Sequence, residues 1–525
     1  MSAGSSGALF LLIGIAFSIY GCSFDRCSKN DDKGGSLLVV ARARDSIILD
    51  PARATDVDSA DTLAQMFETL VAYGENGFEI EPSLAVSWRR STDLKIWTFD
   101  LRRDVRFHDG TKMDADSVVY SFERQSRGGV RQSEFYYWNS YFGDIIKNVK
   151  KLDRYTVQFE LKRPFAPFLA SIAMFPVAIV SPHSCRNLGD RFAREPVGTG
   201  PYRFENWDRT EGQIRLKRFD DYWGTPAQIE TIVFRAITDS RQRVMALQSG
   251  AVHVIRNVDP WAMRMVKLHP DLRVHITRGN NVGFLGLNTR KPPFNNPAVR
   301  WAVNRAVRKD VLVKYVYQGL AEPAFGPLPP VADWAYNDDV EKYPYDEDRA
   351  RRELAAAGYR DDPAQRPKLY VMNTHRPYIP QPILAAQMIA RDLEVIGMPV
   401  DVVIQPFDKH RQSITGGEHN LAIYGWVGDN NDPDNFFSTL LGSTSPLNIS
   451  FWRHAEFSRR VQAARETQEN NSRAEYYKEA QKIVADQAPW IPLAHTKMVV
   501  ALKRSVHGFN LGPSSILRLK GVRIQ

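Results

Sequence analysis

Cysteine is scarce in this chain of 525 residues, which has only Cys22, Cys27 and Cys185. This excludes a framework of disulfides, which small secreted domains use in place of a large hydrophobic core. Cys27 falls in a polar segment near the N-terminus, so we expect Cys27 and Cys185 to be free thiols. The stability of the fold must come from the core that a chain of this length can bury.

Sequence motifs of common hydrolases are also missing. The chain has no Gly-x-Ser-x-Gly turn and no His-Glu-x-x-His helix, and its eleven histidines lie singly, with His410 and His419 the nearest approach to a functional pair. The glycines of Val197 to Gly200 suggest a phosphate loop, but Pro201 breaks the helix that such a loop must start. We expect no catalytic residue, metal or cofactor. A secreted hydrolase, with a site that these motifs do not reveal, is the alternative to a protein without catalytic activity.

Positive charge is in excess but is not concentrated. Lysine and arginine total 69 against 60 acidic residues, which gives a net charge of +9. A nucleic-acid-binding protein would gather these cations into a stripe, so we expect no nucleic-acid partner. Hydrophobic residues at 43% and charged residues at 25% are typical of a soluble globular protein, and the length predicts two or three domains.

A hydrophobic run long enough for a membrane span is absent. The apolar stretch Ala8 to Tyr20 is shorter than the roughly 20 residues that a spanning helix needs. It ends at Gly21-Cys22 and the sequence then becomes polar, which resembles a bacterial lipoprotein signal. The resemblance implies a signal peptide at 1–21, a lipid on Cys22 and a polar tether at 22–36. The alternative is an ordinary export signal without a lipid.

The remaining chain alternates between strand and helix patterns, which predicts a mixed α/β protein. Predicted strands cover 37–41, 96–101, 368–371, 400–404, 421–424 and 498–502, and predicted helices cover 59–71, 114–124, 296–304, 309 to about 319, 347–357, 382–396 and 474–486.

One block, Gly425 to Phe436, carries the strongest functional signal. It follows the strand predicted at 421–424, and its glycines and proline predict an irregular loop. Acidic and amide side chains crowd this loop beside Trp426. Fixed carboxylates and an aromatic ring at a strand end suit a ligand that carries a cation. The alternative is an Asx-rich turn whose side chains only cap their own backbone.

The block resembles the signature loop of periplasmic dipeptide-binding proteins, the family 5 solute receptors of ABC-type peptide importers. Pro196 to Tyr202 and Phe219 to Gly224 also match the family, and the resemblance covers Leu37 to Gln525. It implies a two-lobed periplasmic binding protein fold, in which mixed sheets flanked by helices enclose a ligand cleft and lobe I carries an extra subdomain. Lobe I is expected at 37–278 plus 496–525 and lobe II at 279–495, with hinges at Gly279 and Gly283.

The same resemblance assigns the ligand anchors. Asp429 would pair with the α-ammonium of a bound peptide, and Arg376, in an Arg-Pro-Tyr context, would hold its carboxylate by a two-pronged contact. We count Gly425, Trp426 and Tyr378 as further ligand-binding residues. The alternative for Arg376 is an ordinary surface arginine.

The function implied is a monomeric receptor at the periplasmic or extracytoplasmic face of the membrane. It would bind a dipeptide or short peptide and deliver it to an ABC permease. Other solutes of the superfamily are the alternatives, namely longer oligopeptides, glutathione, nickel chelates and opines. Arg44 and Asp45, expected near the cleft, and Trp138, a candidate pocket wall, could alter the ligand choice.

Overall fold

The computed structural model describes residues 36–74, 77, 79–127, 129–512 and 516–525. The predicted position of Cys22, with the signal peptide and nearly all of the tether, lies outside these residues. In the described part of the chain, no helix combines the length and the apolar character needed to cross a lipid bilayer.

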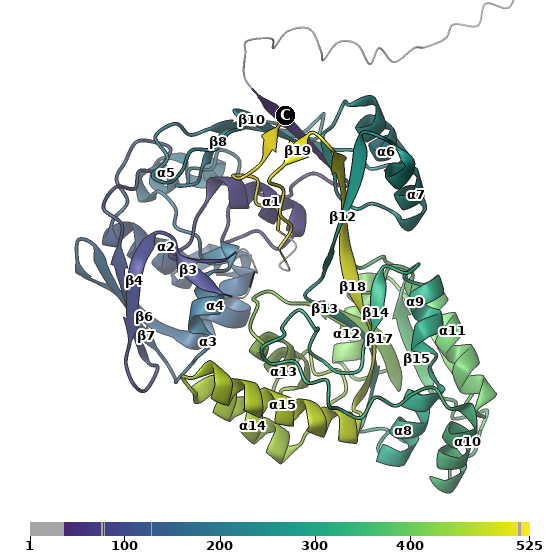
Figure 1. Cartoon of the computed structure of the whole chain (residues 1–525). Helices are drawn as coiled ribbons and strands as arrows, with labels where there is room; N and C mark the ends of the chain where they lie inside the picture. The colour runs from purple at the N-terminus through teal and green to yellow at the C-terminus, as the bar shows by residue number, and fades with distance from the viewer. Residues whose placement is uncertain (1–35, 75–76, 78, 128, 513–515) are drawn as a thin grey trace, which may run out of the picture. The chain divides into compact units, whose positions relative to one another are not determined.

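A 12-stranded mixed sheet forms the centre of the protein (Figure 1). Its path is β16-β15-β17-β13-β18-β11-β1-β10-β9-β8, and β12 and β14 also pair with β18. The strands are β1 (Leu37–Arg42), β8 (Tyr202–Asp208), β9 (Gln213–Arg218), β10 (Thr231–Ala236), β11 (Val254–Ile255), β12 (Leu272–Arg278), β13 (Asn281–Leu287), β14 (Ala321–Pro323), β15 (Lys368–Met372), β16 (Asp401–Gln405), β17 (Leu421–Val427) and β18 (Trp490–Lys503).

Strand β18 joins the two halves of this sheet. Its first part pairs with β13, and its second part pairs with β12 and β11. The strand is longer than the predicted 498–502 because the apolar run before it continues the ladder. Pro492 lies within the strand, where the register with β13 shifts, and such an irregularity accommodates a residue that has no N–H to donate.

The fold has two lobes, as predicted. One lobe contains β1 and β8–β12, together with a separate sheet in the order β4-β5-β7-β6 that forms the extra subdomain. The other contains β13–β17. The remaining strands are β2 (Val71–Tyr73), β3 (Ile80–Pro82), β4 (Ala85–Arg90), β5 (Ile96–Leu101), β6 (Ile146–Asp153), β7 (Thr156–Leu161), β19 (Val506–His507) and β20 (Arg523–Ile524).

Helices cover the sheets in both lobes (Figure 1). The first lobe has α1 (Val57–Met66), α2 (Ala115–Ser126), α3 (Gly143–Ile145), α4 (Phe168–Ile172), α5 (Pro182–Leu188), α6 (Ser240–Ser249) and α7 (Pro260–Leu268). The second has α8 (Pro297–Ala306), α9 (Lys309–Tyr315), α10 (Glu347–Ala356), α11 (Pro382–Val395), α12 (Phe407–Thr415), α13 (Asp434–Leu441), α14 (Ala455–Glu466) and α15 (Asn470–Gln487).

Local sequence explains most helix starts. Asp114 accepts hydrogen bonds from the first free N–H groups of α2, and Asn296 does the same for α8. The helix predicted at 59–71 ends earlier, at Met66. The carbonyl of Met66 accepts its hydrogen bond from the N–H of Gly200 (2.9 Å), so a distant loop replaces the next helical turn. This was not visible from periodicity.

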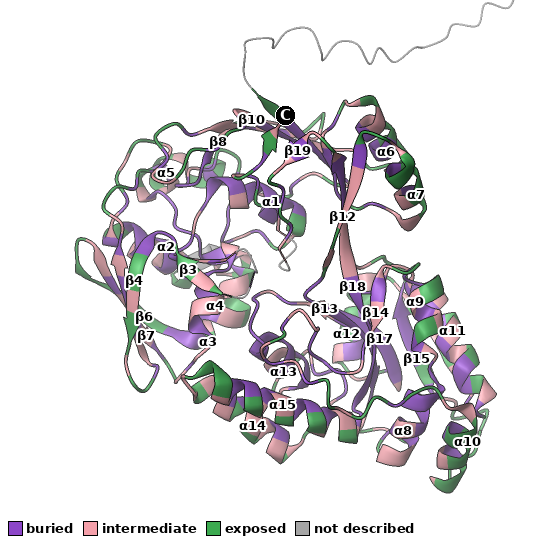
Figure 2. Ribbon diagram, viewed as in Figure 1, coloured by how far each residue is buried: buried purple, intermediate pink, exposed green. Residues whose placement is uncertain are grey.

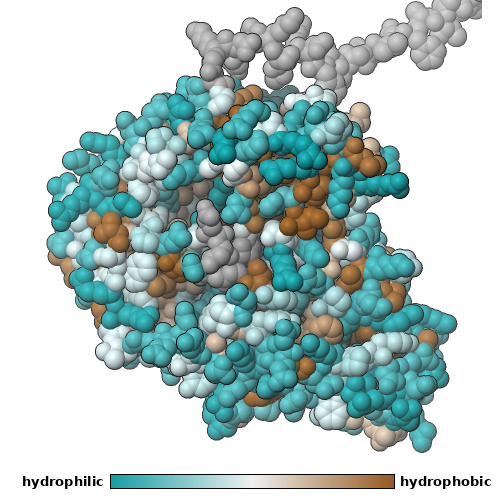
Figure 3. Space-filling model, in the orientation of Figure 1, coloured by the Kyte–Doolittle hydropathy of each residue, from teal (hydrophilic) through white to brown (hydrophobic). Residues whose placement is uncertain are grey.

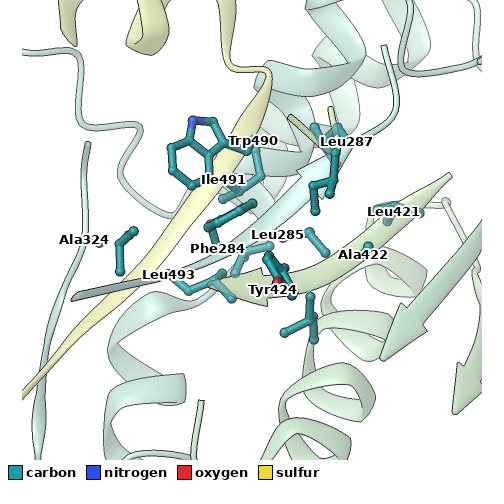
Figure 4. Close-up of a cluster of buried hydrophobic side chains, with 14 of the residues drawn as sticks. Phe284, Leu285, Leu287, Ala324, Leu421, Ala422, Tyr424, Trp490, Ile491 and Leu493 are labelled. Carbon is teal, nitrogen blue, oxygen red and sulfur yellow. The ribbon is translucent and has the colours of Figure 1, made fainter. Parts of the chain in front are cut away.

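The core of the second lobe surrounds β13, β17 and the first part of β18. Every residue of β13 is buried, since β13 is paired on both edges and covered on both faces (Figure 2). Phe284 packs edge-on against Trp490, with ring centroids 3.8 Å apart (Figure 4). Trp490 and Leu493 enter this cluster from β18. The outer surface in Figure 3 is mainly hydrophilic.

Candidate functional site

The loop of the signature block is shorter than the sequence suggests. Gly425 to Val427 belong to β17, and Asp434 already begins α13, so the irregular backbone covers Gly428 to Pro433. The loop thus lies between the end of a buried strand and the start of a helix. Both neighbours are fixed by the core of the second lobe.

Amide side chains hold the shape of this loop. The Asn435 Oδ1 atom accepts hydrogen bonds from the N–H of Asp429 (3.0 Å) and from the indole of Trp426 (2.8 Å). Asn430 Oδ1 accepts from the N–H of Asp432 (3.1 Å). The backbone-capping interpretation is therefore confirmed for Asn430 and Asn435. It does not account for Asp429.

Two of the three carboxylates around the loop are paired with arginine. Asp432 accepts two hydrogen bonds from Arg473, at 2.9 and 2.7 Å, and both side chains are buried. The Oδ1 atom of Asp434 lies 3.2 Å from the Nε atom of Arg465. Because a buried carboxylate without a cation is costly, these pairs satisfy a general requirement of the fold. Neither carboxylate is free to bind a ligand ion.

Asp429 is the exception. It is partly buried, and within the described residues it has no ion pair; its carboxylate accepts a 3.3 Å hydrogen bond from the Tyr137 hydroxyl. Burial raises the pKa of Asp429 to about 6, although the hydrogen bonds from Tyr137 and Asn435 act in the opposite direction. A ligand cation beside this carboxylate would supply the missing charge.

Asp429 lines a cavity of about 270 Å³. All the other described residues of its wall come from the first lobe and from the C-terminal segment, residues 516–525. Asp429 is the one residue of the described wall that belongs to the second lobe. Further contacts join the lobes at this loop. Asn430 donates to the hydroxyl of Tyr141 (3.1 Å), and Asn431 donates to the carbonyl of Gly77.

Arg376 lies just after a strand, at some remove from the cavity that Asp429 lines. It follows β15, the parallel neighbour of β17, and forms a tight turn through reciprocal backbone hydrogen bonds with Ile379. Its guanidinium carbon lies 3.4 Å from the ring centroid of Phe407, and it has no ion pair among the described residues. Arg376 does not line the cavity at Asp429. The two predicted anchors thus follow neighbouring strands but do not share that cavity.

Gly425 and Tyr378 are brought together by packing. A Cβ atom on Gly425 would overlap the ring of Tyr378 and the carbonyl of Val282, so only glycine allows this close approach. On the same side, Gly283 faces the carbonyl of Tyr378 from within β13. Close packing in a central strand is a local reason for glycine at 283, and its role as a hinge stays a prediction. Trp426 is partly buried and is fixed by its hydrogen bond to Asn435.

Sequence reasoning missed three charged residues of the cavity, Arg518, Lys520 and Glu68. Glu68 accepts hydrogen bonds from Tyr222 (2.7 Å), Trp223 (2.8 Å) and Thr199 (3.0 Å). Arg518 stands between two buried leucines in a strand-like alternation, which was the available signal that it points away from the core. Nothing in the sequence indicated that it lines the same cavity as Asp429.

Other candidates lie outside this cavity. Asp45 accepts the indole hydrogen of Trp207 (2.8 Å), Arg44 is 3.5 Å from Asp58, and neither lines the cavity. Trp138 packs against the core of the extra subdomain. Cys185 is a free thiol whose pKa is raised to about 12 by burial.

The paired histidines have structural roles. His410 and His419 are buried, and each ring donates through Nε2 to a backbone carbonyl, that of Ile423 and that of Ile449 respectively, both at 3.0 Å. Burial lowers the pKa of both imidazoles to about 4, so they are neutral at physiological pH. Neither lines the cavity at Asp429.

Known proteins resemble this chain over most of its length. Residues 79–448 match the family model described as bacterial extracellular solute-binding proteins, family 5 Middle. The dipeptide-binding protein of Escherichia coli is 35% identical, with 88% of this chain and 89% of that protein covered. The heme-binding protein A of Haemophilus influenzae is 33% identical, with 88% and 87% covered.

A solved structure gives the same relationship. The periplasmic binding protein DppA from Helicobacter pylori, in complex with the peptide STSA, has a TM-score of 0.78 and 33% identity, with 93% of this chain and 98% of that chain covered. Sequence match, coverage and two-lobed architecture agree. This chain belongs to the bacterial extracellular solute-binding proteins, family 5.

Proposed function

We propose that this protein is an extracytoplasmic receptor that binds dipeptides or short peptides and delivers them to an ABC importer. The observation that carries the proposal is the state of Asp429. Among the carboxylates around its loop, it is the one without an arginine within the described residues, and it faces a cavity. A peptide ammonium is a cation of the size and hydrogen-bonding capacity that this carboxylate lacks.

The ligand carboxylate is assigned to Arg376. This guanidinium has no ion pair among the described residues, and its Nε atom is buried without a partner there. With Asp429 fixed at one end, two opposite charges would select ligand length, because an extended chain advances about 3.3–3.6 Å per residue. We assign Trp426, Gly425 and Tyr378 to the shape of the site between these anchors.

The domain assignment follows the sheet. We assign 37–278 and 496–525 to lobe I and 279–495 to lobe II, which agrees with the change of partners along β18. We further propose that 1–21 is a signal peptide, that Cys22 carries a lipid and that 22–36 is the tether of a monomeric receptor on the extracytoplasmic face of the membrane.

A receptor without catalytic activity fits the residues around Asp429 better than an enzyme. Arg376 and Asp429 offer charges but no nucleophile activated by a neighbouring base. The family also admits other ligands, and one relative is named for heme. These alternatives define the control ligands for the test.

The deciding experiment is calorimetry on the purified protein after bound ligand has been stripped by mild unfolding and refolding. Ala-Ala, tri-alanine, glutathione and hemin are titrated separately, and the peptide is recovered afterwards for mass spectrometry. We expect saturable binding of Ala-Ala and recovery of intact peptide. Hydrolysed product would identify an enzyme, and binding of hemin without any peptide would reject the proposal.

A further inference from the structure

The cavity at Asp429 contains more charge than a peptide ammonium requires. Its described wall combines Asp429 and Glu68 with the cations Arg518 and Lys520. Aromatic and apolar side chains complete it, namely Phe67, Met174, Phe175, Tyr222 and Trp223. A mainly apolar wall with a few fixed charges is the usual form of a selective small-ligand pocket.

The backbone on both sides of Arg518 is fixed by hydrogen bonds to the first lobe. The N–H of Leu517 donates to Asp61 (2.8 Å), and the N–H of Leu519 donates to Gln65 (2.9 Å), both on helix α1. Leu517 and Leu519 are buried in the core of the first lobe. The side chain between them leaves that core on the cavity side and is accessible to solvent.

The guanidinium of Arg518 has no carboxylate partner in the part of the chain that the structure describes. Its Nη1 atom donates to the carbonyl of Tyr73 (2.8 Å), and within the described residues no carboxylate lies within ion-pair distance. Glu68 and Glu81 act on it only at longer range. Since arginine has five N–H donors, several are left to face the cavity.

Glu68 does not act as the counter-ion of Arg518. Three neutral donors, Tyr222, Trp223 and Thr199, already satisfy its oxygens. Lys520 lies with Nζ 5.0 Å from the ring centroid of Tyr222 and adds a second cation to the wall. Once a ligand ammonium neutralises Asp429, the cavity has two cations against one carboxylate.

We propose that Arg518, assisted by Lys520, forms a subsite for an acidic side chain on the first residue of the bound peptide. The inference rests on the proposed function. An ammonium at Asp429 places the Cα of that residue at the cavity wall, so its side chain enters the space that Arg518 faces. A carboxylate there would meet guanidinium N–H groups in the two-pronged geometry that arginine favours.

The test is calorimetry with matched peptides that differ only in charge. Glu-Ala is compared with Gln-Ala, and Ala-Glu with Ala-Gln, for the wild type and for Arg518→Gln. We expect the wild type to bind Glu-Ala at least about tenfold more tightly than Gln-Ala, as for a desolvated charge pair. Arg518→Gln should remove this preference and leave the affinity for Gln-Ala within about twofold, because the anchors are unchanged.

Two further variants keep the result interpretable. Arg523→Gln changes an exposed arginine of the same segment and should retain the preference for Glu-Ala. Arg518→Lys keeps the charge and should retain a reduced preference, which also covers the case in which Arg518→Gln does not fold. Equal affinity of the wild type for Glu-Ala and Gln-Ala, or a preference that survives in folded Arg518→Gln, would overturn the inference.

A third outcome separates this subsite from the main-chain anchor. Amidation of the peptide C-terminus should weaken binding to the wild type and to Arg518→Gln equally, because Arg376 is assigned to that carboxylate. If Arg518→Gln alone abolishes the penalty, Arg518 holds the main-chain carboxylate and the acidic subsite is rejected. If the wild type binds no dipeptide, the proposed function itself fails.

Discussion

The hydroxyl of Tyr137 donates a 3.3 Å hydrogen bond to the carboxylate of Asp429, although the two residues are 292 positions apart in the chain. Tyr137 belongs to the first lobe and Asp429 to the second. The contact joins the lobes at the one carboxylate of the loop that lacks a cation within the described residues.

Removing the charge of Asp429 should weaken peptide binding. We expect Asp429→Asn to lose about 2–4 kcal/mol of binding free energy for Ala-Ala, as for a desolvated ion pair that lacks one partner. Calorimetry measures the loss, and Asp104→Asn, at an exposed position, is the control. In the wild type, N-acetyl-Ala-Ala should bind as weakly as Ala-Ala binds to Asp429→Asn. Equal affinity for the free and acetylated peptides would remove the ammonium site.

Peptide affinity should fall as the pH is lowered through about 6. The pKa of Asp429 is about 6 in the free protein, so below that value the carboxylate is protonated and must lose its proton to pair with an ammonium. The loss approaches tenfold per pH unit, and Asp429→Asn should show no such slope. Tyr137→Phe removes a hydrogen bond that favours the ionised form, so it should move the midpoint to higher pH. A flat wild-type profile between pH 5 and pH 7 would contradict this assignment.

The raised pKa of Asp429 should also make the stability of the ligand-free protein depend on pH. Because the folded-state pKa of Asp429 is raised above the unfolded value, the folded state binds more protons between about pH 4 and pH 6. Its contribution to the free energy of unfolding therefore decreases as the pH rises through this window. Asp429→Asn should remove that contribution. The free energy of unfolding of the variant should therefore increase relative to that of the wild type from pH 4 to pH 7. Urea unfolding at a series of pH values measures it; a constant difference would show that Asp429 titrates normally.

Gly425→Ala should destabilise the second lobe. The added methyl group would overlap the Tyr378 ring and the Val282 carbonyl, and such overpacking costs about 1–3 kcal/mol. Gly326→Ala is the matched control, since its nearest neighbour to a new Cβ, at Gln481, is 3.9 Å away. Thermal unfolding compares the two variants. An unchanged melting temperature for Gly425→Ala would mean that the loop of Tyr378 moves aside freely.

Cys22→Ser should release the protein from the membrane. If Cys22 carries the lipid, the variant should appear in the soluble exported fraction, and its affinity for Ala-Ala should be unchanged because the anchors lie far along the chain. Stable attachment by acylation needs more than one acyl chain. Because the variant would lose every acyl chain on Cys22 together, we expect complete release. Cell fractionation with Cys27→Ser as the control decides this. A Cys22→Ser protein that still sediments with membranes would exclude the lipid as its anchor.

The sequence by itself determined the local elements and the candidate anchors. Apolar periodicity located several of the strands and helices, and Asp114 marked the start of α2 because capping depends on residues next to one another. The glycines and acidic residues after β17 marked the loop of Asp429. Where a distant segment intervenes, as Gly200 does at the end of α1, local patterns predicted the wrong boundary.

Only the tertiary structure decided which charges are available to a ligand. Asp429, Asp432 and Asp434 look equivalent in the sequence, but Arg473 and Arg465 arrive from helices α15 and α14 and neutralise the latter two. The C-terminal segment brings Arg518 to the cavity that Asp429 lines, whereas Arg376 faces Phe407. Ion pairing depends on distance in space and on burial, and neither is encoded by the spacing of residues along the chain.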